Sequence, residues 1–215
     1  MGMASVFADI DGFTNFVDQA IHGGSDEIRE AVKIVHVVRE ELNAVLKEDF
    51  GGKRVRFIGD CIHGLVAEGE RVDDAAKTVR QAALCAAAMR SSFDLCLGIV
   101  GSKAAIDLAV GIEYGQTPMT RLGPRGEESV RCAASKATIE AERTQQAIER
   151  GGVRLGAVAS SVADQAVRKH FSAGRLMSYD SASDLLWTAQ APAVQILRHE
   201  PAARPHAASK KSFRG

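Results

Sequence analysis

The sequence of 215 residues predicts an α+β fold with helices on one side of a mainly antiparallel sheet. Three observations lead to this class. Short apolar runs end at turn residues, as β-strands do. Longer stretches repeat apolar residues at helical spacing. The two kinds of segment follow one another in the order βαββαβ, with additions behind them, and this order is typical of a ferredoxin-like core.

The N-terminal half supplies the first elements of this core. The apolar run "VFADI", which ends at Asp11-Gly12, predicts a buried strand. A long helix follows, from the N-cap Ser25 to the Gly-Gly pair at 51–52. Apolar residues on both sides of Gly59-Asp60 then predict a hairpin over 54–67 with this dipeptide at its tip.

The C-terminal half adds elements of both kinds and then a tail. We expect a helix over 73–93, a loop over 98–105, a strand over 106–115 with a hairpin partner over 116–122, a third helix over 128–150, a strand over 154–158, a helix over 160–169, and short strands over 185–189 and 194–197. From residue 198 to 215, Pro, Ala, Ser, Lys and Arg dominate without periodicity. The prediction is one domain over 1–197 and a disordered basic tail over 198–215.

Composition and charge narrow the function classes. The formal net charge is zero, so no overall field attracts nucleic acid or an anionic membrane. The four cysteines form no CxxC pair and are expected to be buried thiols in a reducing cytosol. We see no signal peptide and no apolar run as long as a membrane span. These observations predict a cytoplasmic protein with neither a nucleic acid nor a membrane as its partner.

Two aspartates, Asp9 and Asp60, are set in apolar runs. A buried acid is costly unless its charge is compensated, and two such acids brought together by folding could share divalent cations. The alternative is that each aspartate only bonds backbone donors at a strand end or turn.

The stretches "FADIDGFT" and "FIGDCIHG" resemble the two metal-binding motifs of the class III nucleotidyl cyclases, in the family's order, and the resemblance extends from Met3 to Leu197. It implies the family's fold and the conversion of a nucleoside triphosphate into a cyclic nucleotide with two Mg²⁺ or Mn²⁺ ions per site. By this resemblance Asp9 and Asp60 hold the ions, and the backbone carbonyl of Ile10 touches one.

The same resemblance implies a phosphate site and a dimer. The turn that contains Gly12, Phe13 and Thr14 would present N–H groups to the β- and γ-phosphates, although Thr14 could instead only cap a helix. Arg131 and Ser135 align with the family's Asn and Arg, which reach across a homodimer interface to the ribose and the reacting phosphate. We expect both on one face of the third helix, at i and i+4. The alternative for Arg131 is an ordinary surface arginine.

The base-reading positions depart from the purine cyclases. Arg56 stands where purine cyclases carry a lysine, and the segment "LGPRGEESV" is shorter than its family counterpart. This altered pocket resembles that of the Pycsar-type pyrimidine cyclases of bacterial anti-phage defence. We expect UTP as substrate because the donors of an arginine suit the two carbonyl oxygens of uracil, although Arg56 could instead point to solvent or to a phosphate. The alternatives are an adenylate cyclase and a non-catalytic domain that binds a nucleotide or a partner.

Overall fold

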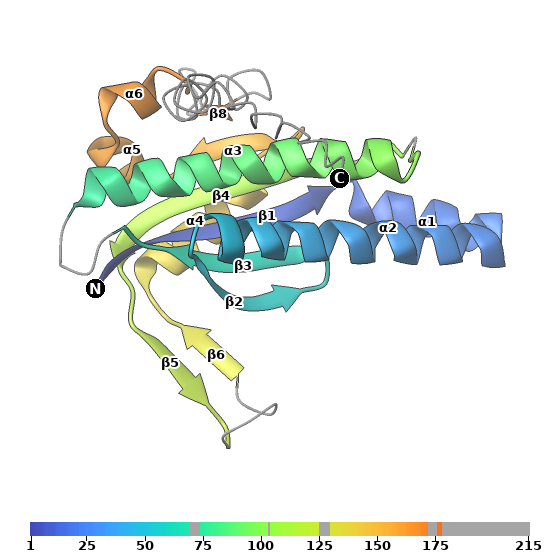
Figure 1. Cartoon of the computed structure of the whole chain (residues 1–215), viewed down its shortest axis with the longest axis horizontal. Helices are drawn as coiled ribbons and strands as arrows, with labels where there is room; N and C mark the ends of the chain where they lie inside the picture. Colours follow the sequence, from blue (N-terminus) through green and yellow to red (C-terminus); the bar gives the residue numbers. More distant parts are fainter. Residues whose placement is uncertain (69–73, 103, 125–129, 172–175, 178–215) are drawn as a thin grey trace, which may run out of the picture.

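The computed structural model describes residues 1–68, 74–102, 104–124, 130–171 and 176–177, and a six-stranded sheet runs through its centre (Figure 1). In sheet order, the strands are β2 (Lys53–Ile58), β3 (Cys61–Val66), β1 (Gly2–Asp11), β4 (Asp107–Gln116), β7 (Gly152–Leu155) and β8 (Leu176–Met177). The helices are α1 (Phe13–Gly23), α2 (Ser25–Ala44), the π-helix η1 (Val45–Asp49), α3 (Ala75–Ile99), α4 (Lys136–Gln146), α5 (Ala157–Val162) and α6 (Gln165–Arg168). A separate ribbon consists of β5 (Met119–Leu122) and β6 (Val130–Ala133).

The first four strands and the helices between them form the predicted ferredoxin-like core. β1 lies in the middle and pairs antiparallel with β3 and β4, so that Ala8 is opposite Ile62 on one side and Val110 on the other. α2 and α3 pack against each other and share one hydrophobic core with this sheet. The α+β class and the βαββαβ order are therefore confirmed.

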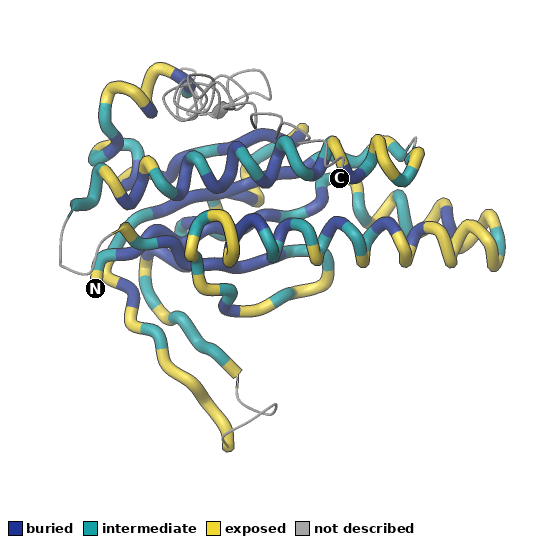
Figure 2. The backbone as a smooth tube through the Cα atoms, viewed as in Figure 1, coloured by how far each residue is buried: buried dark blue, intermediate teal, exposed yellow. Residues whose placement is uncertain are grey.

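α3 owes its close approach to the sheet to small side chains. Ala82, Ala83 and Ala86 are fully buried and belong to the same core cluster as Val6 and Val110. Among the described residues, α3 is also the one helix long and apolar enough to cross a membrane, a property that the sequence pattern did not reveal. Half of its most apolar window is buried inside the fold (Figure 2).

α4 lies on the opposite face of the sheet, which corrects the expectation that the helices share one side. Its buried residues Ala141 and Gln145 sit on Gly111 of β4, whose neighbours Val110 and Ile112 belong to the core cluster with α3. A Cβ atom at Gly111 would lie 2.3 Å from the carbonyl oxygen of Ala141 and 2.4 Å from the amide nitrogen of Gln145. The helix can therefore rest directly on the strand only because residue 111 has no side chain.

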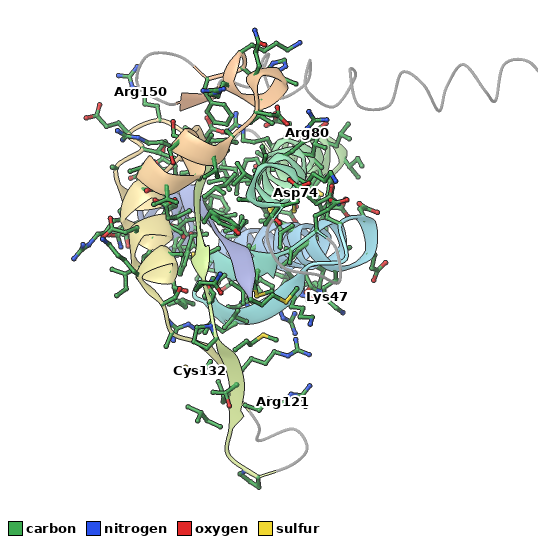
Figure 3. The ribbon with its side chains drawn as sticks, turned by 90° about the vertical axis from the view of Figure 1, so that its left-hand side faces the viewer. Lys47, Asp74, Arg80, Arg121, Cys132 and Arg150 are labelled. Atoms are coloured by element: carbon green, nitrogen blue, oxygen red, sulfur yellow. The ribbon has the colours of Figure 1, made fainter. Side chains whose placement is uncertain are left out.

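The region before α4 also differs from the prediction. Residues 116–122 were expected to pair with the strand over 106–115, but β5 pairs with β6 instead, from Met119 opposite Ala133 to Leu122 opposite Val130. The two strands form an arm that projects from the main sheet (Figures 1 and 3). The helix expected over 128–150 is therefore too long at both ends. "SVRCAAS" suits a helix by its composition, but the backbone of residues 130–133 pairs with β5 as a strand. α4 begins only at Lys136.

Smaller differences concern the ends of elements. In the first crossover α1 precedes the predicted helix, with Gly24 between them, and the predicted helix itself consists of α2 and η1. The strand expected over 154–158 is β7, which begins two residues earlier, ends three residues earlier and runs parallel to β4. The helix expected over 160–169 is divided into α5 and α6. The predicted strands over 185–189 and 194–197 and the tail over 198–215 lie outside the described residues.

Candidate active site

The two predicted acids come together at one end of β1. β3 pairs with β1 only as far as Ala8, and Asp9 follows directly. Asp60 is at the tip of the β2–β3 hairpin, after Gly59, whose φ of 61° favours glycine at this turn position. The N–H of Ile10 donates to Oδ2 of Asp60 at 3.2 Å, which fastens the hairpin tip to the strand. Both carboxyl groups line one cavity of about 510 Å³, which we call the acid cavity.

Side chains of β1 and β3 next to the acids pack tightly against one another. The rings of Phe7 and His63 stack with their centroids 4.2 Å apart, and Nε2 of His63 lies 3.0 Å from the hydroxyl of Ser5. Burial lowers the pKa of His63 to about 4, so its ring is neutral near pH 7. The His63 ring therefore adds no positive charge to offset the acids.

The electrostatics of the pair are unfavourable without a cation. Burial, then the charge of Asp60 and the hydrogen bond between the two side chains, raises the pKa of Asp9 from 3.8 to about 7. Burial also raises the pKa of Asp60. Hydrogen bonds to its carboxylate from its own backbone, from Asp9 and from the backbone of Ile10, and to a smaller extent the charge of Arg39, oppose part of this rise. Two acids that resist joint ionisation would gain most from a bound cation.

The N-terminus of α1 forms another wall of the acid cavity, lined by Gly12, Phe13 and Thr14. Gly12 is the N-cap, in the left-handed conformation with φ 80°, and among the described residues no side chain caps this helix end. The alternative in which Thr14 caps the helix is therefore wrong. The first amide groups of an α-helix have no intrahelical acceptor, and an anion in this cavity would meet them.

Gln145 joins the site from α4 and was not identified from the sequence. Its Nε2 donates to Oδ2 of Asp9 at 3.3 Å, which lowers the pKa of that acid against the effect of burial. Gln145 is 136 positions from Asp9 along the chain. The only signal for it was a polar residue at the spacing of Ala137 and Ala141, on an otherwise small and apolar stripe.

Four arginines line a second cavity of about 400 Å³, which we call the arginine groove: Arg54, Arg56, Arg121 and Arg131. Arg121, labelled in Figure 3, is directly opposite Arg131 on the arm, and Nη1 of Arg131 donates to the backbone oxygen of Arg54 at 2.9 Å. Across the described part of the chain, none of the four forms an ion pair with a carboxylate. Like charges placed opposite each other are unfavourable unless an anion lies between them.

The expected helical pair of Arg131 and Ser135 does not exist. Arg131 is on β6, and Ser135 is the N-cap of α4, where its Oγ accepts from the N–H of Thr138 at 3.1 Å. The same hydroxyl lies 2.9 Å from Oγ1 of Thr117. The structure thus unites Asp9 and Asp60 in the acid cavity, but within one copy Arg56 and Arg131 line a groove that shares no residue with it.

Comparisons with known proteins identify relatives of the chain and proteins with the same fold. No family model matches the chain. Two curated proteins named uridylate cyclase are similar to it: one from a Rhizobium species is 44% identical over 85% of the chain, and one from Pseudomonas aeruginosa is 38% identical over 86%. These matches cover only 35% and 37% of the two relatives, so the chain spans little more than a third of their length.

Solved structures of class III cyclase-like proteins have the same fold as the chain. A class III adenylyl cyclase-like ATP-binding protein from Pseudomonas aeruginosa has a TM-score of 0.77 and 38% identity, over 86% of this chain and 40% of its own. The adenylyl cyclase CyaB from P. aeruginosa has a TM-score of 0.62 and 18% identity, over 75% of this chain and 79% of its own. The chain has the class III nucleotidyl cyclase fold and is a homologue, over most of its length, of a part of the two uridylate cyclases.

Proposed function

We propose that the chain is the catalytic domain of a nucleotidyl cyclase that converts a pyrimidine nucleoside triphosphate, with UTP favoured, into a 3′,5′-cyclic mononucleotide and pyrophosphate. The observation that carries the proposal is the acid pair, in which two half-buried carboxyl groups meet beside a helix N-terminus. In the reaction the 3′-oxygen bonds to the α-phosphorus, the bond from that phosphorus to the leaving pyrophosphate breaks, and the hydroxyl proton is released.

The donor set fits two divalent cations, Mg²⁺ or Mn²⁺. Among the described residues, no cluster of three or more His, Cys, Asp or Glu could hold a metal without help. Mg²⁺ is commonly held by one or two carboxylates together with substrate phosphates, which matches a site with only Asp9 and Asp60. Ile10 would add its backbone carbonyl. When bound, such ions neutralise phosphate charge and make the 3′-hydroxyl easier to ionise.

The remaining walls of the acid cavity would hold the triphosphate. Its β- and γ-phosphates would accept hydrogen bonds from the exposed amide groups at Gly12, Phe13 and Thr14, where the positive end of the α1 dipole adds to the attraction. The packing of α1 against α2 keeps these amides in place. Positioning of this kind is the main contribution that a protein makes to phosphoryl transfer.

The arginine groove would complete the site from a second copy of the chain. A single copy separates acids from arginines, whereas a symmetric homodimer could place each acid cavity against the partner's groove and so form two equal composite sites. In this arrangement we assign to Arg131 the stabilisation of the charge that develops on the reacting phosphate. Because Ser135 already caps α4, we expect it to act by holding the junction between β6 and α4 in place.

Arg56 is our candidate for reading the base. It is exposed on β2 beside a β-bulge between Arg54 and Arg56, and it lines the groove without a carboxylate partner among the described residues. A guanidinium donates to O2 or O4 of uracil, whereas cytosine replaces O4 by an amine that would face another donor. An unpaired buried donor costs about 1–3 kcal/mol, or roughly ten- to hundredfold in selectivity. The name of the two uridylate cyclase relatives supports the same base.

The direct test offers the protein all four ribonucleoside triphosphates at equal concentration with Mn²⁺ and identifies products by mass. Cyclic UMP as the main product supports the proposal, and no cyclic product at all would contradict it. The ATP-binding description of the similar P. aeruginosa structure favours an adenylate cyclase as the second candidate, which cyclic AMP as main product would establish.

The biological setting belongs to the same proposal. A cytoplasmic enzyme that makes a cyclic pyrimidine nucleotide would supply a second messenger, and the resemblance to the Pycsar-type cyclases suggests anti-phage defence. Comparing phage plaque formation on cells that carry the wild-type gene or the Asp60→Asn variant would test this role.

A further inference from the structure

The side chain of Gln145 forms a contact between α4 and the acid pair that the proposed reaction does not use. Gln145 is buried, at 8% exposure, and its Nε2 donates to Oδ2 of Asp9 at 3.3 Å. Burying an amide is unfavourable unless it is hydrogen-bonded. An apolar residue would be the ordinary choice on this stripe of α4, where Ala137 and Ala141 occupy the equivalent positions.

The backbone around Gln145 is placed with little freedom. Its amide nitrogen would lie 2.4 Å from a Cβ atom at Gly111, so the last turn of α4 rests directly on β4. β4 in turn pairs with β1, and Ala109 is opposite Asp9. The donor and the acid it contacts are therefore held by adjacent strands and the helix that covers them, rather than by a loop.

The chemistry of an amide suits this place better than that of other polar groups. A lysine or arginine would neutralise Asp9 and compete with a cation, and a glutamate would bring a third negative charge. An amide donates to one carboxylate oxygen and leaves the charge of the pair unchanged. Outer residues that fix a ligating carboxylate in this way commonly affect metal affinity by about 10–100-fold.

We propose that Gln145 is a positioning residue that orients the carboxylate of Asp9 for a divalent cation and thereby sets the cation affinity of the acid cavity. The inference rests on the proposed function, since it requires that Asp9 and Asp60 bind a metal. Gln145 acts through Asp9 and need not touch the nucleotide.

The test measures Mn²⁺ binding to the full chain, alone and with 3′-deoxy-UTP, which supplies the phosphates but has no 3′-hydroxyl to react. Binding is followed by electron paramagnetic resonance of free and bound Mn²⁺ and by calorimetry. Gln145→Met keeps the length and flexibility of the side chain but removes the donor, and Gln145→Leu is a second apolar replacement in case one variant does not fold. The matched control is Gln146→Met, because Gln146 lines the same cavity but is exposed. Thermal unfolding without metal verifies that each variant is folded.

We expect the dissociation constant for Mn²⁺ to rise about 10–100-fold in the Gln145 variants and less than about threefold in Gln146→Met. The spectrum of bound Mn²⁺ should also change only in the Gln145 variants. If the wild type binds Mn²⁺ and folded Gln145 variants bind it equally well, the inference is wrong and the proposed metal site stands. If the wild type binds no Mn²⁺ at this site, either alone or with 3′-deoxy-UTP, the proposed metal site is wrong and the inference is wrong as well.

Discussion

Replacing Asp9 by Asn should stabilise the metal-free protein at pH 8, although it removes a residue of the proposed active site. The pKa of Asp9 is raised from 3.8 to about 7 in the folded state. An acid with a raised pKa destabilises the fold wherever the folded state must ionise it. This cost is absent below about pH 4, grows between pH 4 and pH 7, and is complete above pH 7. Asparagine has no such ionisation, and its amide oxygen can still accept the hydrogen bond of Gln145.

The size of the expected stabilisation follows from the same shift in the pKa of Asp9. One pKa unit corresponds to about 1.4 kcal/mol, so the rise from 3.8 to about 7 would amount to about 4 kcal/mol for a fully buried group. Asp9 is only half-buried and is screened by water, so we expect about 1–2 kcal/mol in the free energy of unfolding. In a domain of this size, each kcal/mol shifts the melting temperature by about 2–4 °C. The variant should therefore melt about 2–8 °C above the wild type at pH 8 and show a much smaller difference at pH 4.

The assay is thermal unfolding by circular dichroism in a chelator, at several pH values from about 4 to 8. Asp18→Asn serves as the control, because Asp18 is exposed on α1 outside the acid cavity. A difference between Asp9→Asn and the wild type that does not change with pH would refute the reasoning. Saturating Mn²⁺ should reverse the order, since only the wild type would gain about 2.7 kcal/mol at a hundredfold excess over the dissociation constant.

Three further outcomes are expected. Mixing inactive Asp9→Ala with inactive Arg131→Ala should restore turnover through mixed dimers with one intact site, and no recovery despite measured subunit exchange would contradict composite sites. Gly111→Val should lower the free energy of unfolding by about 1–3 kcal/mol or more, as measured in urea, because its side chain would collide with the backbone of α4; an unchanged denaturation midpoint would show that α4 does not rest on β4. Ser135→Ala should lose about 1 kcal/mol of stability through the missing N-cap, whereas Ser135→Asn should keep both the cap and the turnover. A folded Ser135→Asn protein without turnover would instead indicate a catalytic hydroxyl.

The class of fold was readable from the sequence because local patterns and tertiary structure agree in the core. Alternating and helical apolar spacing depend on which face of an element is buried, and each core element buries one face continuously. The positions of Asp9 and Asp60 were equally readable, since each follows an apolar run and interrupts it at the end of a strand or at a turn. Gly59 supplied the turn signal for the second acid.

Only the tertiary structure decided what surrounds these acids. The contact of Gln145 with Asp9 spans 136 positions, and no local pattern encodes a partner at that separation. The sequence prediction for the arm failed for a different reason, because two local structures compete there. Residues 130–133 carry a composition that suits a helix, but their backbone groups gain more from pairing with β5 than from a turn of helix that would leave β5 unpaired. Arg131 therefore lies in the arginine groove rather than on the predicted helix, and the separation of that groove from the acid cavity is a property of the folded sheet, set by long-range pairing.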